Sequence, residues 1–290
     1  MELEPELRQQ ILIYQRLEIT EHHIYHRLAQ IVPSAENRRI LEKIAQDELR
    51  HSQNWKKYTG EEIEPDRFAI WKYILISRIL GLTFGIKLME HGEEAAQSNY
   101  TELQKAIPAV DAWIRDENEH EQMLIDMLDE ELLEYVGSVV LGLSDALVEL
   151  TGALAGLTLA LQNTKLIALS GLITGIAAAM SMAASEYLST RSEKTSKQPI
   201  RAAIYTGIAY TITVACLILP YLLITNYYVD LAIALSIAVL IIAAFNYYIS
   251  VAKDESFRRR FFEMAGLSLG VAGFSFVIGY LVRQLLGINL

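Results

Sequence analysis

The sequence has almost no cysteine, and this shortage excludes two kinds of site. The single cysteine, Cys216, lies in an apolar stretch. One cysteine cannot close an intrachain disulfide, and it cannot supply a Cys-x-x-Cys metal site. The chain also lacks any strand signal and the basic-then-apolar start of a secretory signal. We therefore expect an all-helical chain whose first part stays in the cytoplasm.

Histidine is absent from residues 136–290, and acidic residues are scarce there. Residues 1–135 carry 27 acids, 15 bases and all 6 histidines, whereas residues 136–290 carry 8 acids and 10 bases. The second part consists mostly of long apolar runs. The composition therefore predicts two domains, an acidic soluble domain at 1–135 and a membrane domain at 136–290.

Apolar residues at helical spacing predict four helices in the first domain. Ser34 is a candidate N-cap for the second helix, and Gly60 is a candidate stop. Short connections between long helices are typical of an up-and-down bundle. The four expected ranges are 6–31, 35–58, 65–106 and 108–135.

One heptapeptide pattern, Asp-Glu-x-x-His-x-Gln, occurs twice, at 47–53 and at 116–122. Each copy falls within an expected helix, where Glu and His three residues apart share one face. A single Glu-x-x-His occurs by chance on many solvated helices, but two copies in matched helices predict a metal site. The two pairs are Glu48 with His51 and Glu117 with His120.

The other two helices are expected to supply the remaining carboxylates of this metal site. Glu18 does so on the first helix, and Glu90 and Glu93 are both candidates on the third. Glu93 has a tyrosine seven residues later, as Glu18 has, which favours Glu93, although both glutamates share a face. This is the ligand set of di-iron and di-manganese carboxylate bundles. Carboxylates with two imidazoles suit Fe(II) or Mn(II) better than copper or structural zinc.

The third helix has a rival interpretation, because residues 70–89 are apolar enough to suggest a membrane span. Lys72, Arg78 and Lys87 are spread along this stretch. Each central base would cost roughly 2.5 to 3.5 kcal/mol in lipid. We therefore expect a buried bundle helix, lying against the membrane, instead of a span.

Five apolar runs in the second domain are each near the ~20 residues that a bilayer span requires. The expected spans are 136–161, 166–188, 202–225, 229–251 and 263–286. The loops after the second and the fourth span are basic, whereas the opposite loops offer only Lys165. The positive-inside rule therefore predicts that the basic loops and the first domain face the cytoplasm and that the C-terminus lies outside.

Glycines spaced four residues apart occur in three of these spans. Such pairs allow helices to approach closely and are better suited to packing than to chemistry. The pairs are Gly152 with Gly156, Gly171 with Gly175, and Gly266 with Gly270.

Acidic side chains inside the expected spans are a second functional signal. Asp145 and Glu149 share a face of the first span, and Glu186 lies near the end of the second, where an interfacial position is the alternative. No Lys, Arg or His lies inside the first four spans to neutralise them, so protons or metal ions are their expected partners. Met180 and Met182 lie within two turns of Glu186. Their thioethers suit Fe(II), with ordinary packing as the alternative role.

Several stretches of the chain resemble known families. GLSDALVELTGALAGL and MSMAASEYLSTRSE resemble the first two spans of the vacuolar iron transporter family. QRLEITEHHIYHRLA, IAQDELRHSQNW, LMEHGEEA and IRDENEHEQML resemble a rubrerythrin-type ferritin-like domain. Together they are similar to the membrane-bound ferritin-like proteins of prokaryotes, in which the two domains are fused. The resemblance covers essentially the whole chain.

This resemblance implies a four-helix ferritin-like bundle followed by a five-span membrane domain that works as a dimer and exchanges Fe(II) or Mn(II) for protons. The family's transport path includes an intramembrane Asp and the Met-bearing segment of the second span. On this chain, these positions are Asp145, Met180, Met182 and Glu186. Two departures are visible. The Glu-rich insertion that plant relatives carry after span two is missing, and so is the four-cysteine module of rubrerythrins, which disfavours a peroxidase with its own electron relay.

We therefore expect a proton-coupled exporter of Fe(II) or Mn(II) in a prokaryotic cell membrane, with a cytoplasmic di-iron domain that captures or senses the metal. Its expected partners are metal ions, protons, lipid and a second copy of the chain, and not nucleic acid. The expected cofactor is an Fe(II)/Fe(III) di-iron centre, with Mn(II) as the alternative. A membrane-anchored ferroxidase or peroxide scavenger is the other hypothesis, so enzymatic activity stays open.

Overall fold

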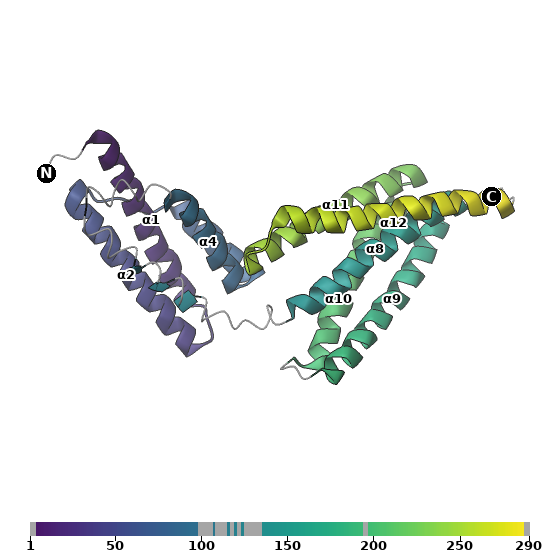
Figure 1. Ribbon diagram of the computed structural model, residues 1–290, viewed down its shortest axis with the longest axis horizontal. Coiled ribbons are helices and arrows are strands. Elements are labelled where there is room, and N and C mark those ends of the chain that lie inside the picture. Colours follow the sequence, from purple (N-terminus) through teal and green to yellow (C-terminus); the bar gives the residue numbers. More distant parts are fainter. Residues whose placement is uncertain are drawn as a thin grey trace. The chain divides into compact units, whose positions relative to one another are not determined.

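The computed structural model describes most of the chain and shows only helices among the described residues (Figure 1). The chain divides into two compact units, residues 1–130 and residues 131–290. The described residues are 4–97, 107, 115–116, 119–120, 123–124, 135–193 and 197–286, and the side chains of 90–97 and 286 are outside the description.

Helices α1 (Pro5–Ala29) and α2 (Ala35–Thr59) lie side by side in the first unit (Figure 1). The Ser34 hydroxyl caps α2 by accepting a hydrogen bond from the Asn37 N–H at 3.2 Å. Gly60 ends α2 with a left-handed φ of 71°, which glycine adopts without strain. Both predicted boundaries of the second helix are therefore confirmed. Ile24, Leu28 and Ile44 are among the apolar side chains buried between these helices.

The predicted third helix is two helices, α3 (Arg67–Leu80) and α4 (Leu82–Gln97). The break falls at Gly81, whose φ of 96° and ψ of 152° lie outside the regions open to other residues. The chain bends there so tightly that Gly85 lies directly against Ser77. The expectation of one continuous helix is wrong at this glycine, and its predicted end near residue 106 lies outside the described residues.

The predicted burial of 70–89 holds in its second part, where Phe84, Ile86 and Met89 of α4 are buried, and is wrong for α3. Only Ile70 and Ser77 are buried on it. Phe68, Trp71 and Ile79 expose 69%, 58% and 68% of their surface. At 14 residues α3 is also shorter than the ~20 that a membrane span requires.

The fourth predicted helix, 108–135, is described only in part. Residues 115–116, 119–120 and 123–124 are helical, and the rest of that range up to residue 134 lies outside the described residues. The described part nevertheless includes His120 and Leu124, both of them buried.

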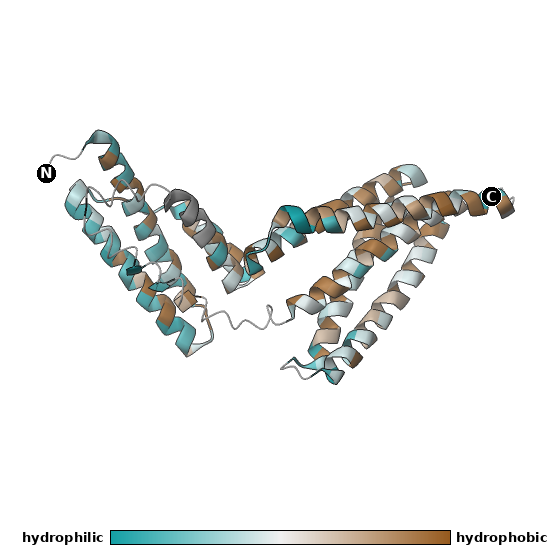
Figure 2. Cartoon of the chain, in the orientation of Figure 1, coloured by the Kyte–Doolittle hydropathy of each residue, from teal (hydrophilic) through white to brown (hydrophobic). Residues whose placement is uncertain are grey.

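The second unit contains five helices long and apolar enough to cross a membrane, within the part of the chain that the structure describes. They are α8 (Val136–Leu161), α9 (Thr164–Ser192), α10 (Pro199–Leu223), α11 (Tyr227–Lys253) and α12 (Phe257–Leu286). Figure 2 shows that these helices are mostly apolar, whereas α1 and α2 are mostly polar. The five predicted spans are confirmed as helices, each to within a few residues.

Glycines bring α8 against its neighbours. Gly142 lies on the backbone of Thr206 in α10, and Gly156 lies against Gly279 in α12. The expected packing role therefore holds for Gly152 with Gly156 and for Gly171 with Gly175, which all have close neighbours on other helices. No other described atom lies within 4 Å of a Cβ placed at Gly266 or Gly270, so the single chain does not test the expected packing role of this pair.

Candidate functional site

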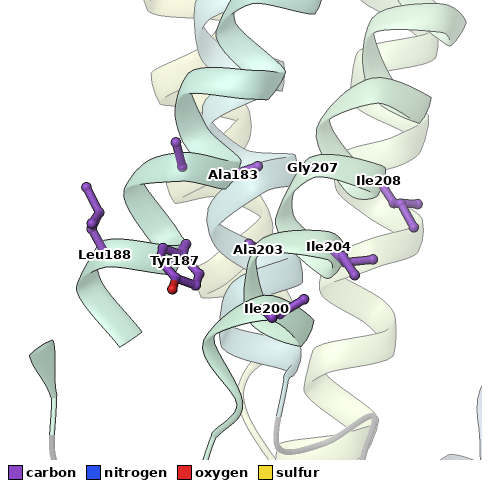
Figure 3. Close-up of a pocket in the computed structure, with 9 residues that line it drawn as sticks. Ala183, Tyr187, Leu188, Ile200, Ala203, Ile204, Gly207 and Ile208 are labelled. Atoms are coloured by element: carbon purple, nitrogen blue, oxygen red, sulfur yellow. The ribbon is translucent and has the colours of Figure 1, made fainter. Parts of the chain in front are cut away.

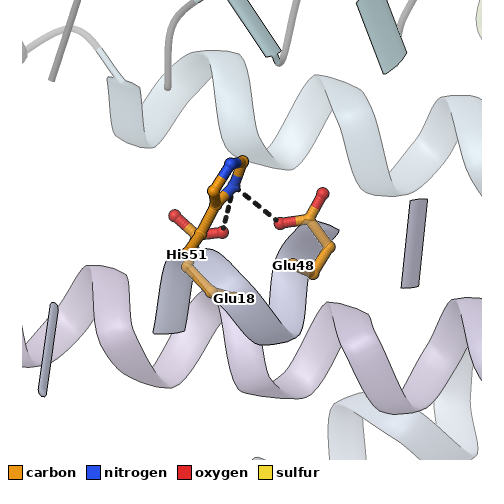
Figure 4. A group of neighbouring side chains, drawn as sticks. All are labelled: Glu18, Glu48 and His51. Atoms are coloured by element: carbon orange, nitrogen blue, oxygen red, sulfur yellow. Dashed lines mark ion pairs between the residues drawn. The ribbon is translucent and has the colours of Figure 1, made fainter. Parts of the chain in front are cut away.

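The first unit gathers Glu18, Glu48 and His51 into one buried group. Glu18 comes from α1, and α2 supplies the other two from one face. One potential ligand atom from each of the three lies within 4.8 Å of the others. Figure 4 shows the His51 imidazole facing both carboxylates, with Nδ1 3.4 Å from Glu18 Oε2 and 3.6 Å from Glu48 Oε2.

His120 approaches the same group from the second copy of the repeated heptapeptide. Its Nδ1 lies 3.0 Å from Glu48 Oε1, and its ring centroid lies 6.0 Å from that of His51. The Glu48 carboxylate therefore stands between two imidazoles, one facing each oxygen. A carboxylate in this position can bridge two metal ions.

The aspartates that precede the two Glu-x-x-His pairs cross over between the copies. Asp116 Oδ2 lies 3.1 Å from His51 Nε2, and Asp47 Oδ2 lies 3.1 Å from His120 Nε2. Arg50 ties both aspartates together, with contacts of 2.9 Å to each. Each imidazole can thus donate a hydrogen bond from its Nε2–H to a carboxylate and turn Nδ1 toward Glu48.

Sequence reasoning missed Asp47 and Asp116 as functional candidates, although the signal was present. Both copies of the heptapeptide begin with Asp, and only the Glu and His were interpreted as ligands. The crossed pairing accounts for the Asp that precedes Glu-x-x-His in each copy of the pattern.

The donor set fits a hard or borderline divalent cation. Buried carboxylate oxygens and imidazole nitrogens are the ligands that Fe(II) and Mn(II) prefer, and no thiolate is present to select a softer metal. The indole Nε1 of Trp55 donates a hydrogen bond to Glu18 Oε1 at 3.1 Å, which holds that carboxylate in place. Glu18 and Glu48 are only 5% and 2% exposed, so a bound cation would be shielded from water.

The remaining predicted ligands of this group are not described at the side-chain level. Glu90 and Glu93 lie on α4, with side chains outside the description, so the choice between them stays open. Glu117 lies outside the described residues.

Neutral hydroxyl groups hold two of the acidic side chains of the membrane unit. The Tyr210 hydroxyl on α10 donates a hydrogen bond to Glu149 Oε2 at 2.7 Å. Ser138 Oγ near the start of α8 donates to Glu186 Oε1 at 2.5 Å. Within the described residues, neither carboxylate forms an ion pair with a base. This agrees with the absence of Lys, Arg and His from the first four expected spans.

The other predicted path residues differ in burial. Asp145 is half-buried on α8, one turn before Glu149. Met182 is partly buried against the apolar core of the unit. Met180 is 71% exposed, so its thioether lies on the outer surface of the single chain.

An apolar groove of about 650 Å³ lies between α9 and α10 near the loop that joins them (Figure 3). Tyr187, Ile200 and Ile204 are among the side chains that line it. It contains no carboxylate, imidazole or thioether, so it suits hydrocarbon and not a metal ion.

One family model matches part of the chain. Residues 136–198, which form α8, α9 and the start of the following loop, match the VIT family. The match includes Asp145, Glu149, Met180, Met182 and Glu186, and it does not include the first unit. No curated protein sequence matches the chain. Together with the five apolar helices, the match indicates an integral membrane protein and suggests a membrane transporter of iron or manganese.

Proposed function

We propose, with the VIT-family match of residues 136–198 as the premise, that the chain exchanges Fe(II) or Mn(II) for protons across a cell membrane. The observation that carries the proposal is a pair of carboxylates in the matched segment that have hydroxyl partners and, in the described part of the chain, no basic partner. Glu149 and Glu186 are each held by one hydrogen bond from a neutral hydroxyl. Such groups can take a divalent cation or a proton, because no fixed base neutralises them.

Release of the ion follows from the chemistry of these side chains. A carboxylate must be deprotonated to bind a metal, so protonation lowers its affinity for the cargo. Protons arriving from outside at Asp145, Glu149 or Glu186 would therefore displace the ion. The basic loops 191–201 and 253–260 support a cytoplasmic loading side, which makes the transporter an exporter.

The first unit would capture or sense the cytoplasmic metal. Its buried group, Glu18, Glu48, His51 and His120, resembles one side of a di-metal carboxylate bundle, which Glu117 and either Glu90 or Glu93 would complete. We place this unit in the cytoplasm with the basic loops. We also propose that two copies of the chain form the working transporter in lipid, since Met180 lies on the outer surface of one copy.

Two variants of the full-length protein in liposomes test this division of labour. Asp145→Asn is expected to abolish metal flux while metal binding to the first unit is unchanged. Glu48→Ala is expected to remove binding to the first unit while the membrane unit still transports metal at high concentration. Persistent flux in Asp145→Asn would contradict the assigned path.

A second function, a membrane-anchored ferroxidase, is favoured by one observation, the Glu48 carboxylate between two buried imidazoles. This reading predicts oxygen consumption in proportion to added Fe(II), without metal flux into sealed liposomes. Flux without oxygen consumption would exclude it.

A further inference from the structure

A buried polar cluster lies at the end of the membrane unit opposite the basic loops. Thr158 near the end of α8, Tyr221 near the end of α10 and Asp230 at the start of α11 contribute to it. Thr158 and Asp230 are 0% exposed and Tyr221 is 1% exposed. The Thr158 and Tyr221 hydroxyl oxygens lie 2.9 Å apart, and Tyr221 interacts electrostatically with the Asp230 carboxylate.

The Asp230 carboxylate is the unusual member of this cluster. Both of its oxygens are buried, and neither has a hydrogen-bond partner among the described residues. Asp is common in the first turn of a helix, where the positive end of the helix dipole favours negative charge. At such positions the carboxylate normally reaches water or a backbone N–H, and here Asn226 already caps α11.

Among the described residues, no basic side chain forms an ion pair with Asp230 from the helices packed against α11. On α10 the titratable group within electrostatic range of Asp230 is the Tyr221 phenol. On α8 the acidic residues Asp145 and Glu149 lie at least nine residues before Thr158, about 14 Å along the helix axis. Arg283 in the last turn of α12 and the exposed Lys165 at the start of α9 form no ion pair with Asp230 in the described chain.

A lone buried carboxyl group in these surroundings selects a small ligand. An ionised carboxylate without a partner is strongly disfavoured in an apolar environment, and such a group is neutralised instead. A divalent cation needs about six oxygen or nitrogen ligands, and one carboxylate with two hydroxyls falls short of that number. A proton needs only the carboxyl oxygen itself.

We propose that Asp230 binds a proton and serves as a proton-exchange site at the end of the membrane unit opposite the basic loops. The proton enters and leaves from that side of the unit, at moments when water reaches the buried carboxyl oxygen. The role in exchange rests on the proposed transport function, whereas proton binding itself does not. Asp230 was not among the acids expected inside the spans, because it stands only two residues into the predicted fourth span.

Infrared spectroscopy of the full chain in liposomes tests proton binding directly. At neutral pH, the wild-type protein is expected to show the carbonyl stretch of a protonated carboxyl group that Asp230→Asn lacks. Asp254→Asn is the matched control, because it makes the same change at the exposed opposite end of α11. Its left-handed φ of 53° suits Asn as well as Asp. The control should keep the band.

Circular dichroism and thermal unfolding are expected to be unchanged in Asp230→Asn, since an amide has the shape of a protonated carboxyl group. An unaltered carboxyl band in Asp230→Asn would overturn proton binding. Proton binding would also be overturned if the wild-type protein lacked the band and the variant unfolded. That pair of results would mean that the Asp230 carboxylate is charged and is needed for folding.

Metal flux measured against the pH on the far side of the liposome membrane tests the exchange role. Asp230→Asn is expected to lose the dependence on that pH, while Asp254→Asn keeps it. If metal flux through the Asp230→Asn variant kept the wild-type dependence on that pH, the exchange role would be overturned. Absence of flux in the wild-type protein would refute the transport function, and the infrared result would still decide whether Asp230 binds a proton.

Discussion

At the scale of single residues, the crossed pairing of the two heptapeptides sets the orientation of both imidazoles. Asp116 faces His51 Nε2 and Asp47 faces His120 Nε2, each at 3.1 Å. A carboxylate that accepts a hydrogen bond from Nε2–H fixes the tautomer in which Nδ1 carries the lone pair. In this arrangement, both Nδ1 atoms face Glu48, where a metal ion would be held.

Removing one of these aspartates should weaken metal binding without removing a ligand. Asp116→Asn is expected to lower the affinity of the first unit for Fe(II) or Mn(II) by about 10- to 100-fold, the usual effect of losing a carboxylate behind a ligating histidine. Competition titration with a metal indicator measures it. Glu119→Gln, an exposed change on the same helix, is the control, and equal affinities in the two variants would refute the positioning role.

Asp66 should make the start of α3 sensitive to acid. Hydrogen bonds from the Ala69 and Phe68 N–H groups hold the pKa of its carboxyl group below the ordinary value of 3.8. The charged carboxylate therefore stabilises α3 fully above pH 3.8, and this stabilisation is lost as the pH falls through the lower pKa of the folded chain.

Hydrogen exchange at the Phe68 and Ala69 amides, corrected for the intrinsic rate, measures this effect. Protection is expected to fall with acid in the wild-type protein and to stay constant in Asp66→Asn, whose neutral side chain also caps. The same acid dependence in both proteins would assign it to another group.

At the scale of helices, glycine decides how closely α8 and α12 approach. Gly279 lies against the carbonyl oxygen of Gly156, with no room for a Cβ atom between them. Backbone atoms cannot move aside as a flexible side chain can. The two helices would therefore have to separate to accept a larger residue.

Gly279→Ala is therefore expected to destabilise the membrane unit by about 1–3 kcal/mol, the usual cost of overpacking. Unfolding in mixed micelles measures the change in free energy. Gly273→Ala on the same helix has open space for its Cβ atom and should have little effect. Equal stabilities of the two variants would mean that this contact does not hold the helices together.

The helices show what local sequence signals can and cannot predict. Ser34 and Gly60 marked the ends of α2 because capping depends on nearby residues. The break at Gly81 was missed, since glycine in an apolar stretch does not reveal which φ it adopts. The exposed face of α3 was missed for a related reason. Apolar composition indicates that one face of a helix will be buried, but it does not indicate which neighbouring element buries that face.

The candidate site follows the same rule. Glu48, His51 and His120 were predicted because helical spacing places Glu and His of each Glu-x-x-His pattern on one face. Glu18 was predicted because the first helix was expected to supply a further carboxylate. The crossed contacts of Asp47 and Asp116 depend on how two helices face each other, which no local pattern states. Asp230 was not predicted as a functional residue, because its burial depends on how the helices pack.

At the scale of the whole molecule, the proposed orientation can be tested with cysteine labelling. The single native cysteine makes this simple, because Cys216→Ser gives a chain free of thiols. In that background, Arg258→Cys should react with a membrane-impermeant maleimide only from the cytoplasmic face of cell-derived vesicles. Lys165→Cys should react only from the other face. Labelling of both from one face would contradict the assigned orientation.

The measurement that tests the central claim most directly is metal flux in sealed liposomes of the purified full-length protein. Fe(II) and Mn(II) are compared with and without an imposed pH gradient. The account predicts flux of at least one of the two ions, driven by the gradient and coupled to proton movement in the opposite direction. No flux of either ion, in protein that still binds metal in its first unit, would contradict it.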